Sequence, residues 1–359
     1  MSVPSFLASH RPEPVLVTGG TGLLGRHVVQ ALRAAGDDVR LLARDPGSVA
    51  AGCEVVAGDV GDRVAVRSAL RSVRAVYHLA AVTEKWRRDP GEFERVNVDA
   101  AVELARAAAE CGVERVVHVS SFTVFGPSGA TGAASASGSE GVVDERAVAP
   151  TANLQNDYQR SKHRAHVRLA ELAANGSAPV VIACPGVVYG TGTAAARNPI
   201  ADLVQRQVSG RLRGFPALDR RWTLAWAPDV ARGLLLLRQR GRVGESYLLG
   251  GPVASLRELC AQVGAWAGRA VPRDLPLAPL LALGRCAELA ARISHARRSP
   301  RLSAAALRFL RHDWVFRSAK AIALGYECTP LRDGLLALSS DLHARQLVDH
   351  APPAAVPAA

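Results

Sequence analysis

A tyrosine and a lysine four residues apart are the side chains in this sequence best suited to proton transfer. Tyr158 and Lys162 stand at the start of a helical run that continues through Leu169 and Leu172. Because positions i and i+4 share one face of a helix, the phenol and the ammonium point the same way. A nearby cation favours the phenolate, so we expect Lys162 to lower the pKa of Tyr158 from its usual value of about 10. The pair predicts an acid–base group at Tyr158, although an exposed helix with an incidental pair would have the same spacing.

Lysine is rare in this sequence, and its rarity supports a role for Lys162. The lysines among the 44 basic residues are Lys85, Lys162 and Lys320, and the others are arginines. A lysine at this spacing, in a chain that otherwise uses arginine, indicates a need for a compact ammonium. Codon bias is the alternative explanation.

Two serines follow an apolar run, residues 115–119, that predicts a buried strand. A hydroxyl at Ser120 or Ser121 could hydrogen-bond a carbonyl oxygen while Tyr158 delivers the proton. Serines that merely cap a strand are common, so this pair alone is ambiguous. Its place between a glycine-rich loop and the Tyr–Lys pair is more specific.

The glycine-rich loop, residues 18–25 (TGGTGLLG), lies between a predicted strand and a predicted helix. Gly19, Gly22 and Gly25 would let the backbone turn sharply and approach a ligand without a Cβ clash. The N–H groups and the positive dipole end of the helix would then face an anion, most simply a dinucleotide pyrophosphate. A tight strand-to-helix turn without a ligand is the alternative.

The elements that must position these residues alternate between strand and helix. Apolar patterns predict strands at residues 15–17, 39–42, 54–57, 75–79, 115–119 and 180–183, and helices at 23–35, 63–72, 91–111 and 155–174. This alternation predicts an α/β fold in which a doubly wound parallel sheet of the Rossmann type is covered by helices on both faces. The carboxyl ends of the strands then meet at one edge, where a ligand binds.

The second half of the chain predicts a smaller lobe. Helices are expected at 198–208, 229–239 and 254–266, with a strand at 246–249. We therefore expect a disordered N-terminus over residues 1–13, an NAD(P)-binding domain over 14–185, a C-terminal α/β substrate lobe over 186–345 and a disordered tail over 346–359. Residues 128–141 consist mainly of Gly, Ala and Ser and predict a flexible loop.

Composition is that of a globular protein, with 48% hydrophobic and 21% charged residues. The net charge of +12 comes from scattered arginines rather than from one tract, so we expect no nucleic-acid partner. Six cysteines lie far apart without metal-ligand spacing, which predicts buried, reduced thiols, no metal site and a cytoplasmic location. The apolar run at 275–283 is short and broken by prolines, so we expect no transmembrane segment.

Together these motifs resemble the extended short-chain dehydrogenases/reductases of the NAD(P)-dependent epimerase/dehydratase superfamily, over residues 14–340. TGGTGLLG matches the TGxxGxxG of that family, and Tyr158 and Lys162 match its YxxxK. Residues 120–126 (SSFTVFG) match its SSxxVYG, with Phe125 in place of tyrosine. The resemblance implies that Ser121 polarises a carbonyl, that Tyr158 is the general acid in reduction, and that Lys162 also grips the nicotinamide ribose.

The resemblance also implies a set of cofactor contacts at the edge of the sheet. Further matches are residues 58–60 (GDV), 78–81 (HLAA), 97–98 (NV) and 185–190 (PGVVYG). Contacts are expected from Gly19, Thr21, Gly22, Leu23, Leu24, Arg44, Asp59, Val60, Leu79, Ala80, Ala81, Asn97, Ser120, Tyr158, Lys162, Pro185, Gly186 and Val188. Asp59 would lie on the adenine side, and a helix N-cap or a surface position is the alternative for Asn97. We expect His78 and His118 to be structural.

The end of the second strand bears on the choice of cofactor. NAD sites of this fold usually place an acidic residue there to hold the ribose diol. Here the strand ends in Arg44, which suits a 2′-phosphate and leaves a diol without its acceptor. Asp45 follows at once and could turn inward. We therefore predict NADP, with NAD as the alternative.

Departures from the family's patterns narrow the reaction. Dehydratases of this family place Asp-Glu after the catalytic hydroxyl, where this chain has Phe122 and Thr123. Sugar-nucleotide epimerases have an arginine and an asparagine where this chain has Cys184 and Val187. The chain is most similar to the branch of 3β-hydroxysteroid dehydrogenases and dihydroflavonol-reductase-like ketoreductases. This resemblance implies an NADP-dependent ketoreductase or secondary alcohol dehydrogenase that acts on a mainly apolar substrate.

Two other functions stay open. One is an NAD-dependent sugar-nucleotide epimerase or dehydratase that uses the same triad. The other is a sensor that binds NAD(P) without turnover, which the presence of both Tyr158 and Lys162 disfavours. Residues 225–231 (AWAPDVA) lack the His and Asp of the related branch, so its substrate contacts do not transfer in detail.

Several apolar residues of the predicted substrate lobe could contact a substrate. Phe215, Trp222 and Trp226 could line an apolar pocket or belong to the core. Residues 275–289 could form a lid over a hydrophobic substrate, a weak contact with a membrane surface, or a simple packing helix.

The resemblance further implies a homodimer. Members of the family pair the helices that correspond here to 91–111 and 155–174. Small side chains would let these helices approach a second copy closely, and the candidates are Ala105, Ala108 and Ala109.

Overall fold

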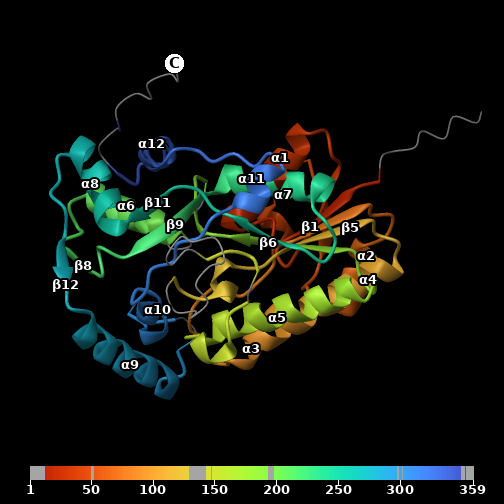
Figure 1. Cartoon of the computed structure of the whole chain (residues 1–359), viewed down its shortest axis with the longest axis horizontal. Coiled ribbons are helices and arrows are strands. Elements are labelled where there is room, and N and C mark those ends of the chain that lie inside the picture. The colour runs from red at the N-terminus through yellow and green to blue at the C-terminus, as the bar shows by residue number, and fades with distance from the viewer. Residues whose placement is uncertain are drawn as a thin grey trace, which may run out of the picture.

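A parallel sheet forms the centre of the structure, which is a computed structural model (Figure 1). The structure describes residues 13–49, 52–128, 143–146, 148–192, 198–296, 299–300, 302–348 and 352. Within these residues, seven strands pair in the order β10 (Ser246–Leu249), β6 (Val180–Pro185), β5 (Arg115–Val119), β4 (Ala75–His78), β1 (Val15–Thr18), β2 (Val39–Ala43) and β3 (Glu54–Ala57). The predicted doubly wound parallel sheet is confirmed.

Strand pairing aligns the carboxyl ends of the central strands. Thr18, the last residue of β1, is in register with Leu42 of β2 and with His78, the last residue of β4. His78 is in turn in register with His118 near the end of β5. The segments that follow these strands therefore begin at one edge of the sheet, as expected for a fold of this class.

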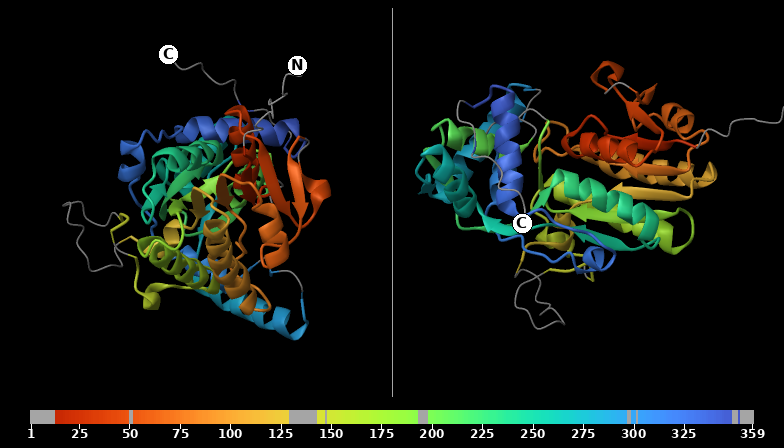
Figure 2. Two further views of the ribbon diagram at one scale, coloured as in Figure 1. Left: turned by 90° about the vertical axis from the view of Figure 1, so that its right-hand side faces the viewer. Right: turned by 90° about the horizontal axis from the view of Figure 1, so that it is seen from above.

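Helices cover both faces of the sheet (Figures 1 and 2). One face carries α1 (Leu23–Ala34), α7 (Ala227–Arg240) and α11 (Ala319–Ala323). The other carries α2 (Arg63–Ala69), α4 (Ala100–Glu110) and α5 (Asp157–Ala174). The sheet is apolar on both sides, with Val15 and Val17 packed against the first group of helices and Leu16 against the second. This two-sided burial explains why the central strands are mainly apolar, whereas the edge strand β3 is partly exposed.

The second region of the molecule lies beside the main sheet. It contains α6 (Pro199–Val208), α8 (Leu256–Ala267), α9 (Leu277–Ile293), α10 (Ala304–Phe309) and α12 (Leu331–Ala344). It also contains two small sheets, one of β11 (Val253–Ser255), β9 (Arg221–Trp226) and β7 (Val187–Tyr189) and the other of β12 (Arg273–Leu275) and β8 (Gly214–Pro216). Trp222 and Trp226 are buried in a core shared with α6 and α8, which favours the core interpretation of these residues.

The boundary between the two regions differs from the one expected at residue 186. Strand β10 was expected in the substrate lobe, but it pairs with β6 as an edge strand of the main sheet. Helix α7 packs against α1, β5 and β6, and α11 packs against β10. Residues 227–249 thus return to the nucleotide-binding half, which the order of elements along the chain does not reveal.

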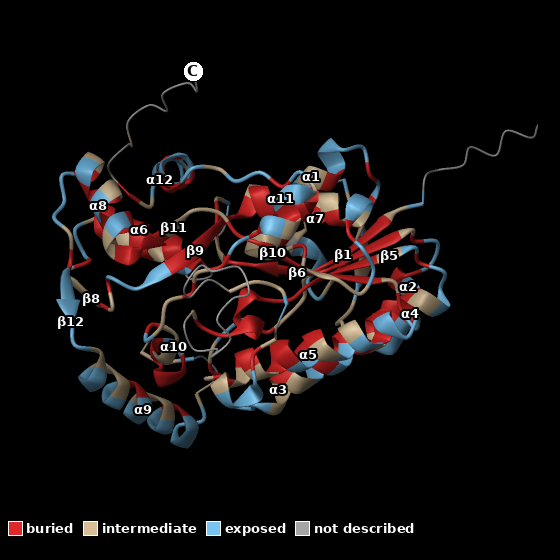
Figure 3. Cartoon of the chain, viewed as in Figure 1, coloured by how far each residue is buried: buried red, intermediate tan, exposed pale blue. Residues whose placement is uncertain are grey.

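Helix α9 lies at the margin of the second region and is mostly exposed (Figure 3). Its inner face packs on α10, where Gly284 allows close approach because a Cβ there would lie 2.7 Å from the backbone nitrogen of Ala304. Glu288 accepts hydrogen bonds from the Ser303 hydroxyl at 2.6 Å and the Ala305 N–H at 2.9 Å. Of the three roles considered for residues 275–289, a packing helix therefore applies to the inner face of α9. Among the described residues, no helix is both long and apolar enough to span a bilayer.

Two expectations about small side chains are wrong. Of the six cysteines expected to be buried, Cys184 and Cys260 are, whereas Cys53 is half-buried and the other three are exposed. Ala105 and Ala108 of α4 are buried in the core of this chain, so they cannot face a second copy. They cover the sheet instead, because a helix that packs on a sheet directs its small apolar face inward.

Several expected segments lie mostly or wholly outside the described residues. They are the N-terminal segment 1–13, of which residue 13 is described, the loop at 128–141, of which residue 128 is described, and the tail at 346–359, of which residues 346–348 and 352 are described.

Candidate functional site

The glycine-rich loop connects β1 to α1 at the carboxyl edge of the sheet. Gly19 has a φ of +73°, and a Cβ there would lie 2.7 Å from the backbone nitrogen of Ala80, so a larger residue does not fit. A Cβ on Gly25 would overlap the Gly19 carbonyl, which shows how closely α1 packs on the loop. Helix α1 starts after Gly22 with no side-chain cap and no acidic residue in its first turn. The positive end of the helix is therefore available to an anion.

A hollow beside this loop extends toward the end of β2. It is lined by Gly20, Thr21, Arg26, Val29, Leu41, Gly47 and Val49. Thr21, Leu23 and Leu24, which were expected to contact the cofactor, are half-buried in the turn and the start of α1. The loop, the helix end and the hollow together fit a dinucleotide.

Arg44 and Asp59 stand together at the ends of β2 and β3. The Arg44 side chain is 83% exposed, and its Nε lies 3.9 Å from an Asp59 carboxylate oxygen. Asp59 also accepts the Gly61 N–H at 2.9 Å, and Val60 beside it is half-buried. Asp45 accepts the N–H of Gly47 at 3.1 Å, within its own turn. Arg44 and Asp45 are thus both exposed at the end of β2.

Leu79, Ala80 and Ala81 follow β4 and run beside the glycine loop. The N–H of Ala80 donates to the Thr18 hydroxyl at 3.3 Å, and the N–H of Leu79 to the Thr18 carbonyl at 3.1 Å. All three residues are half-buried. Their backbone lines the edge where Gly19 approaches it.

The proposed catalytic residues meet at the ends of β5 and the start of α5. Tyr158 is buried close to Ser121, whose side chain acts to lower the Tyr158 pKa, and the Ser121 hydroxyl lies 2.9 Å from that of Thr123. Lys162, one turn further along α5, is buried and donates from Nζ to the Val119 carbonyl at 2.9 Å. The structure thus brings Ser121, Tyr158 and Lys162 together at the sheet edge.

The pKa of Tyr158 does not shift in the expected direction. Burial raises the pKa of Tyr158 above its usual value, and the Ser121 side chain only partly offsets this. Lys162 is not among the causes of the shift. Burial also lowers the pKa of Lys162, to about 8, with the Cys184 thiol acting in the opposite direction. The reason is desolvation, which disfavours the charged form of both groups and which helix spacing alone does not reveal.

Lys85 is a residue of this site that was not singled out from the sequence. It lies in the segment after β4, and its Nζ is 3.5 Å from the centroid of the Tyr158 ring. It is half-buried, and burial is the main cause that lowers its pKa to about 7, followed by the charge of Lys162. The sequence holds only three lysines, and two of them, Lys85 and Lys162, belong to this site. The rarity of lysine could therefore have pointed to Lys85.

Asn97 fixes the segment that carries Lys85. It lies in a π-helical turn, Glu94–Asp99, and is buried. Its side-chain oxygen accepts the Val82 N–H at 2.7 Å, and its amide donates to the Val82 carbonyl at 3.0 Å and to the Ser161 hydroxyl at 2.9 Å. Neither the N-cap nor the surface alternative applies, because Asn97 connects the segment after β4 to α5.

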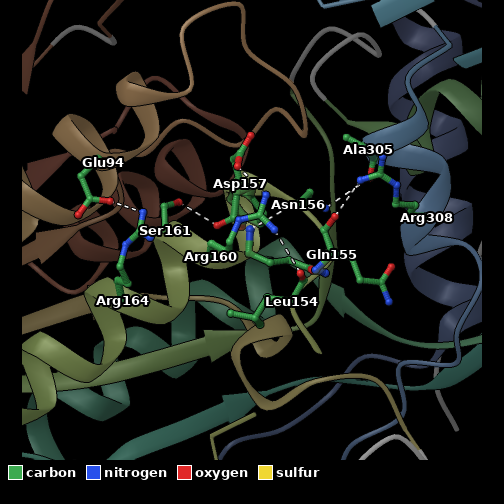
Figure 4. Close-up of polar contacts among 12 residues, drawn as sticks. Glu94, Leu154, Gln155, Asn156, Asp157, Arg160, Ser161, Arg164, Ala305 and Arg308 are labelled. Carbon is green, nitrogen blue, oxygen red and sulfur yellow. Dashed lines mark hydrogen bonds and ion pairs between the residues drawn. The ribbon is translucent and has the colours of Figure 1, made fainter. Parts of the chain in front are cut away.

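The start of α5 is anchored to α10 and to the π-helical turn (Figure 4). Asn156 caps the helix by accepting the Gln159 N–H at 2.9 Å, and its amide donates to the Ala305 carbonyl at 3.4 Å. Arg308 donates to the Gln155 carbonyl at 3.2 Å. On the outer side, Arg164 pairs with Glu94. These contacts hold the turn of α5 that carries Tyr158.

Comparison with known proteins assigns the family. Residues 15–250 match the model of the NAD dependent epimerase/dehydratase family. The chain belongs to this family. Its resemblance to the extended short-chain dehydrogenases/reductases is confirmed, and the protein is an NAD(P)-dependent oxidoreductase acting on CH–OH groups.

Relatives in this family include both reductases and proteins of sugar-nucleotide chemistry. "Sterol demethylase protein B" of Methylococcus capsulatus is 31% identical over 75% of this chain and 79% of its own length. The 4-hydroxy-2-methyl-3-oxo-4-farnesyl-3,4-dihydroquinoline-1-oxide ketoreductase of Stigmatella aurantiaca is 29% identical over 66% and 68%. The structure of MoeE5 in complex with UDP-glucose and NAD has a TM-score of 0.69 and 25% identity, and covers 93% of this chain and 99% of that one.

The remaining residues that the sequence analysis expects to contact the cofactor lie at and just after the ends of β5 and β6. The Ser120 hydroxyl faces Nδ1 of His166 at 3.2 Å, so it is engaged inside the fold. Pro185 ends β6, and the N–H of Gly186 donates to the Leu249 carbonyl at 3.0 Å where the chain turns into β7. Val188 is half-buried within β7. These three segments border the catalytic group on the side of β6.

Two histidines lie beneath the site in neighbouring strands. Nδ1 of His78 lies 2.7 Å from the Thr18 hydroxyl, and the His78 and His118 rings are 5.3 Å apart. Burial lowers the pKa of His78 to about 3 and that of His118 well below its usual value. Both are therefore neutral core residues at neutral pH, in agreement with the structural role expected.

Proposed function

We propose that this protein is an NADP-dependent ketoreductase or secondary alcohol dehydrogenase that acts on a mainly apolar substrate. The observation that carries the proposal is the burial of Ser121, Tyr158 and Lys162 together at the end of β5 and the start of α5, at the edge of the sheet that carries the glycine loop. A hydroxyl and a phenol placed side by side in this way can both reach one carbonyl oxygen.

Each member of the triad has one task in this proposal. The chemistry that bound NADPH supplies is a hydride for the carbonyl carbon. Ser121 donates a hydrogen bond to the carbonyl oxygen and holds it against the phenol. Tyr158 gives its proton to that oxygen as negative charge develops. Lys162 holds the ribose hydroxyls of the cofactor.

The preference for NADP is supported by Arg44. Its guanidinium extends from the end of β2, where a fork of N–H donors suits a phosphate group. Asp45, the acidic residue nearby, is engaged by Gly47 in its own turn. Arg44→Ala should raise the KM for NADPH more than that for NADH.

The apolar character of the substrate is supported by the surroundings of Ser121. Phe122, the next residue, packs against the rings of Phe309, Trp314 and Phe316, with ring centroids 5.5–6.1 Å apart. The wall beside the catalytic hydroxyl is therefore aromatic rather than polar. The family's dehydratases need two acidic residues at the positions of Phe122 and Thr123, and neither of these side chains can remove a proton.

The epimerase is the second candidate, and the family itself and the likeness to MoeE5 favour it. An epimerase uses the same triad but returns the hydride to the substrate, so it keeps NAD bound. Cys184 and Val187 stand where sugar-nucleotide epimerases have polar residues, which argues against a nucleotide-sugar substrate.

We further propose that the outer face of α9 makes weak contact with a membrane surface. Leu283, Leu289 and Ile293 are exposed on it, together with Arg285 and Arg292. Apolar side chains bordered by arginines suit an anionic lipid surface. In a flotation assay, the wild type should rise with phosphatidylglycerol vesicles. Leu289→Glu should weaken this vesicle binding. Val64→Glu, which changes an exposed valine of α2, is the control and should leave the binding unchanged. A homodimer and a cytoplasmic location stay predictions.

A spectrophotometric screen tests the main proposal. Purified protein is mixed with NADPH and with ketosteroids, β-keto acids, flavanonols and aldehydes in turn. Consumption of free NADPH with a ketone supports a reductase. Protein that carries tightly bound NAD and consumes no NADPH supports the epimerase instead.

A further inference from the structure

Lys85 is a titratable group of the site that the proposed mechanism does not use. Its Nζ lies 3.5 Å from the centre of the Tyr158 ring, so the ammonium stands within a few bond lengths of the phenol oxygen. A group bound by this ammonium would therefore lie beside the reacting carbonyl.

The three lysines of the chain differ in what accepts their protons. Lys162 donates to the Val119 carbonyl at 2.9 Å. Lys320 donates to the Ser246 carbonyl at 2.8 Å and forms an ion pair with Glu245 at 2.8 Å. Lys85 forms no hydrogen bond or ion pair with any residue that the structure describes. Its neighbour Glu84 is paired with Arg87 at 3.0 Å.

The surroundings of Lys85 are unfavourable for a cation that serves only the fold. Burial and the charge of Lys162 both lower its pKa, to about 7, and only Glu84 acts in the other direction. A cation–π contact offsets part of this cost, by about 0.5–2 kcal/mol. Two ammonium groups near one phenol, with one lacking an acceptor, form a site that an anion would stabilise.

The segment that carries Lys85 is held in place on both sides. Trp86, the next residue, is buried and packs against Ala291 of α9 and Ala305 of α10. On the other side, Asn97 binds both backbone groups of Val82. Lys85 therefore stands on a fixed segment, and its position over Tyr158 is built into the fold.

We propose that Lys85 binds an anionic group of the substrate, a carboxylate in the first place, located a few bonds from the carbonyl that is reduced. This rests on the proposed function and specifies its substrate as an apolar molecule with one acidic group. The pyrophosphate of a cofactor does not compete for this role, because it belongs at the start of α1 beside the glycine loop. Lys85 then acts as a substrate-binding residue that orients the carbonyl toward Ser121 and Tyr158.

A pair of substrates that differ in one charge tests the proposal. The probes are 3-oxodecanoate and 3-oxodecanamide, which share the reacting carbonyl and the apolar chain. The wild type should favour the acid in kcat/KM, and Lys85→Met should reduce the acid-to-amide ratio by about 10- to 100-fold, the loss expected for one hydrogen bond to a charged group. Lys320→Met is the matched control, because Lys320 also lies over a tyrosine ring, and it should keep the wild-type ratio.

Binding without turnover separates this inference from the proposed function. Calorimetry with decanoate and decanamide on NADP⁺-loaded protein should show tighter binding of the acid, lost in Lys85→Met. If the acid binds in this way but no ketone is reduced, the reductase proposal fails and the site stands. If the wild type reduces ketones without preferring the acid, or if Lys85→Met and Lys85→Gln both keep the preference, the anion site is refuted.

Discussion

Two lysines of this protein lie over tyrosine rings, and their surroundings differ. Lys320 stands 4.6 Å from the centre of the Tyr247 ring, with Glu245 and the Ser246 carbonyl as acceptors. Lys85 stands 3.5 Å from the centre of the Tyr158 ring and has no acceptor among the described residues. The first is a contact that joins α11 to β10, and the second lies at the edge where the family binds its cofactor.

The two pairs teach how to separate a structural cation from a functional one. A lysine that serves the fold has its charge neutralised within the chain, as Lys320 does. A half-buried lysine without a carboxylate costs free energy in the folded state, and such a cost is typical of functional sites. Substitutions around the two pairs test this contrast.

Removal of the phenol should separate the two tyrosines most clearly. Tyr158→Phe should lower kcat about 10²- to 10⁴-fold, the usual loss for a general acid. Tyr247→Phe should leave kcat unchanged and cost about 1 kcal/mol of stability, because the Tyr247 hydroxyl accepts the Arg242 N–H at 3.0 Å. Steady-state kinetics and urea unfolding measure both. Full activity in Tyr158→Phe would contradict the acid role.

Removal of Asn97 should loosen the segment under Lys85. Asn97→Ala leaves both backbone groups of Val82 buried without partners, at a cost of about 3 kcal/mol in the free energy of unfolding. Asn175→Ala is the control: Asn175 is exposed and accepts one N–H, from Ser177, so it should cost less than about 1 kcal/mol. Equal losses in the two variants would show that the Asn97 network is not what holds the segment.

Stability should rise with pH because of Lys162. Burial lowers its folded-state pKa to about 8. The unfolded chain keeps the lysine protonated up to a pKa of about 10.4, so it binds more protons than the folded chain in between. Lys162 should therefore raise the free energy of unfolding from pH 8 to 10, by up to about 1.4 kcal/mol per pH unit. Lys85, whose pKa is lowered to about 7, adds a contribution of the same sign that remains in a Lys162 variant. Urea unfolding at several pH values measures this slope, and Lys162→Met should reduce it. If Lys162→Met showed the same pH dependence of the free energy of unfolding as the wild type, that dependence would come from other groups.

Removal of the structural lysine should have the smallest effect. Lys320 and Glu245 are partly exposed, and pairs of this kind contribute about 0–1 kcal/mol. Lys320→Met should lower the melting temperature by a few degrees at most and leave kcat unchanged. A large loss of activity would mean that the two lysine–tyrosine pairs do not differ in the way described.

The local features of the fold were predictable from the sequence. The strands from β1 to β6 are apolar runs, and the glycine loop is set by steric demands on its own backbone, so both follow from neighbouring residues. Tyr158 and Lys162 share a face because helix geometry requires it. Features that depend only on residues close together in the chain can therefore be predicted from the sequence.

The features that were missed depend on contacts between distant segments. Lys85 meets Tyr158 because Asn97 and Trp86 fix the segment after β4, and neither contact is visible in sequence order. The pKa of Tyr158 follows its burial rather than its spacing from Lys162. Ala105 and Ala108 looked suited to a second copy, yet that face of α4 covers the sheet.

Transfer of deuterium from the cofactor tests the central claim most directly. The protein is incubated with NADPH deuterated at C4 of the nicotinamide and with a ketone identified by the screen, and the product is analysed by mass spectrometry. The account predicts an alcohol with one deuterium at the former carbonyl carbon and release of NADP⁺, both lost in Tyr158→Phe. A product without deuterium, or an inverted alcohol formed while NAD stays bound, would contradict it.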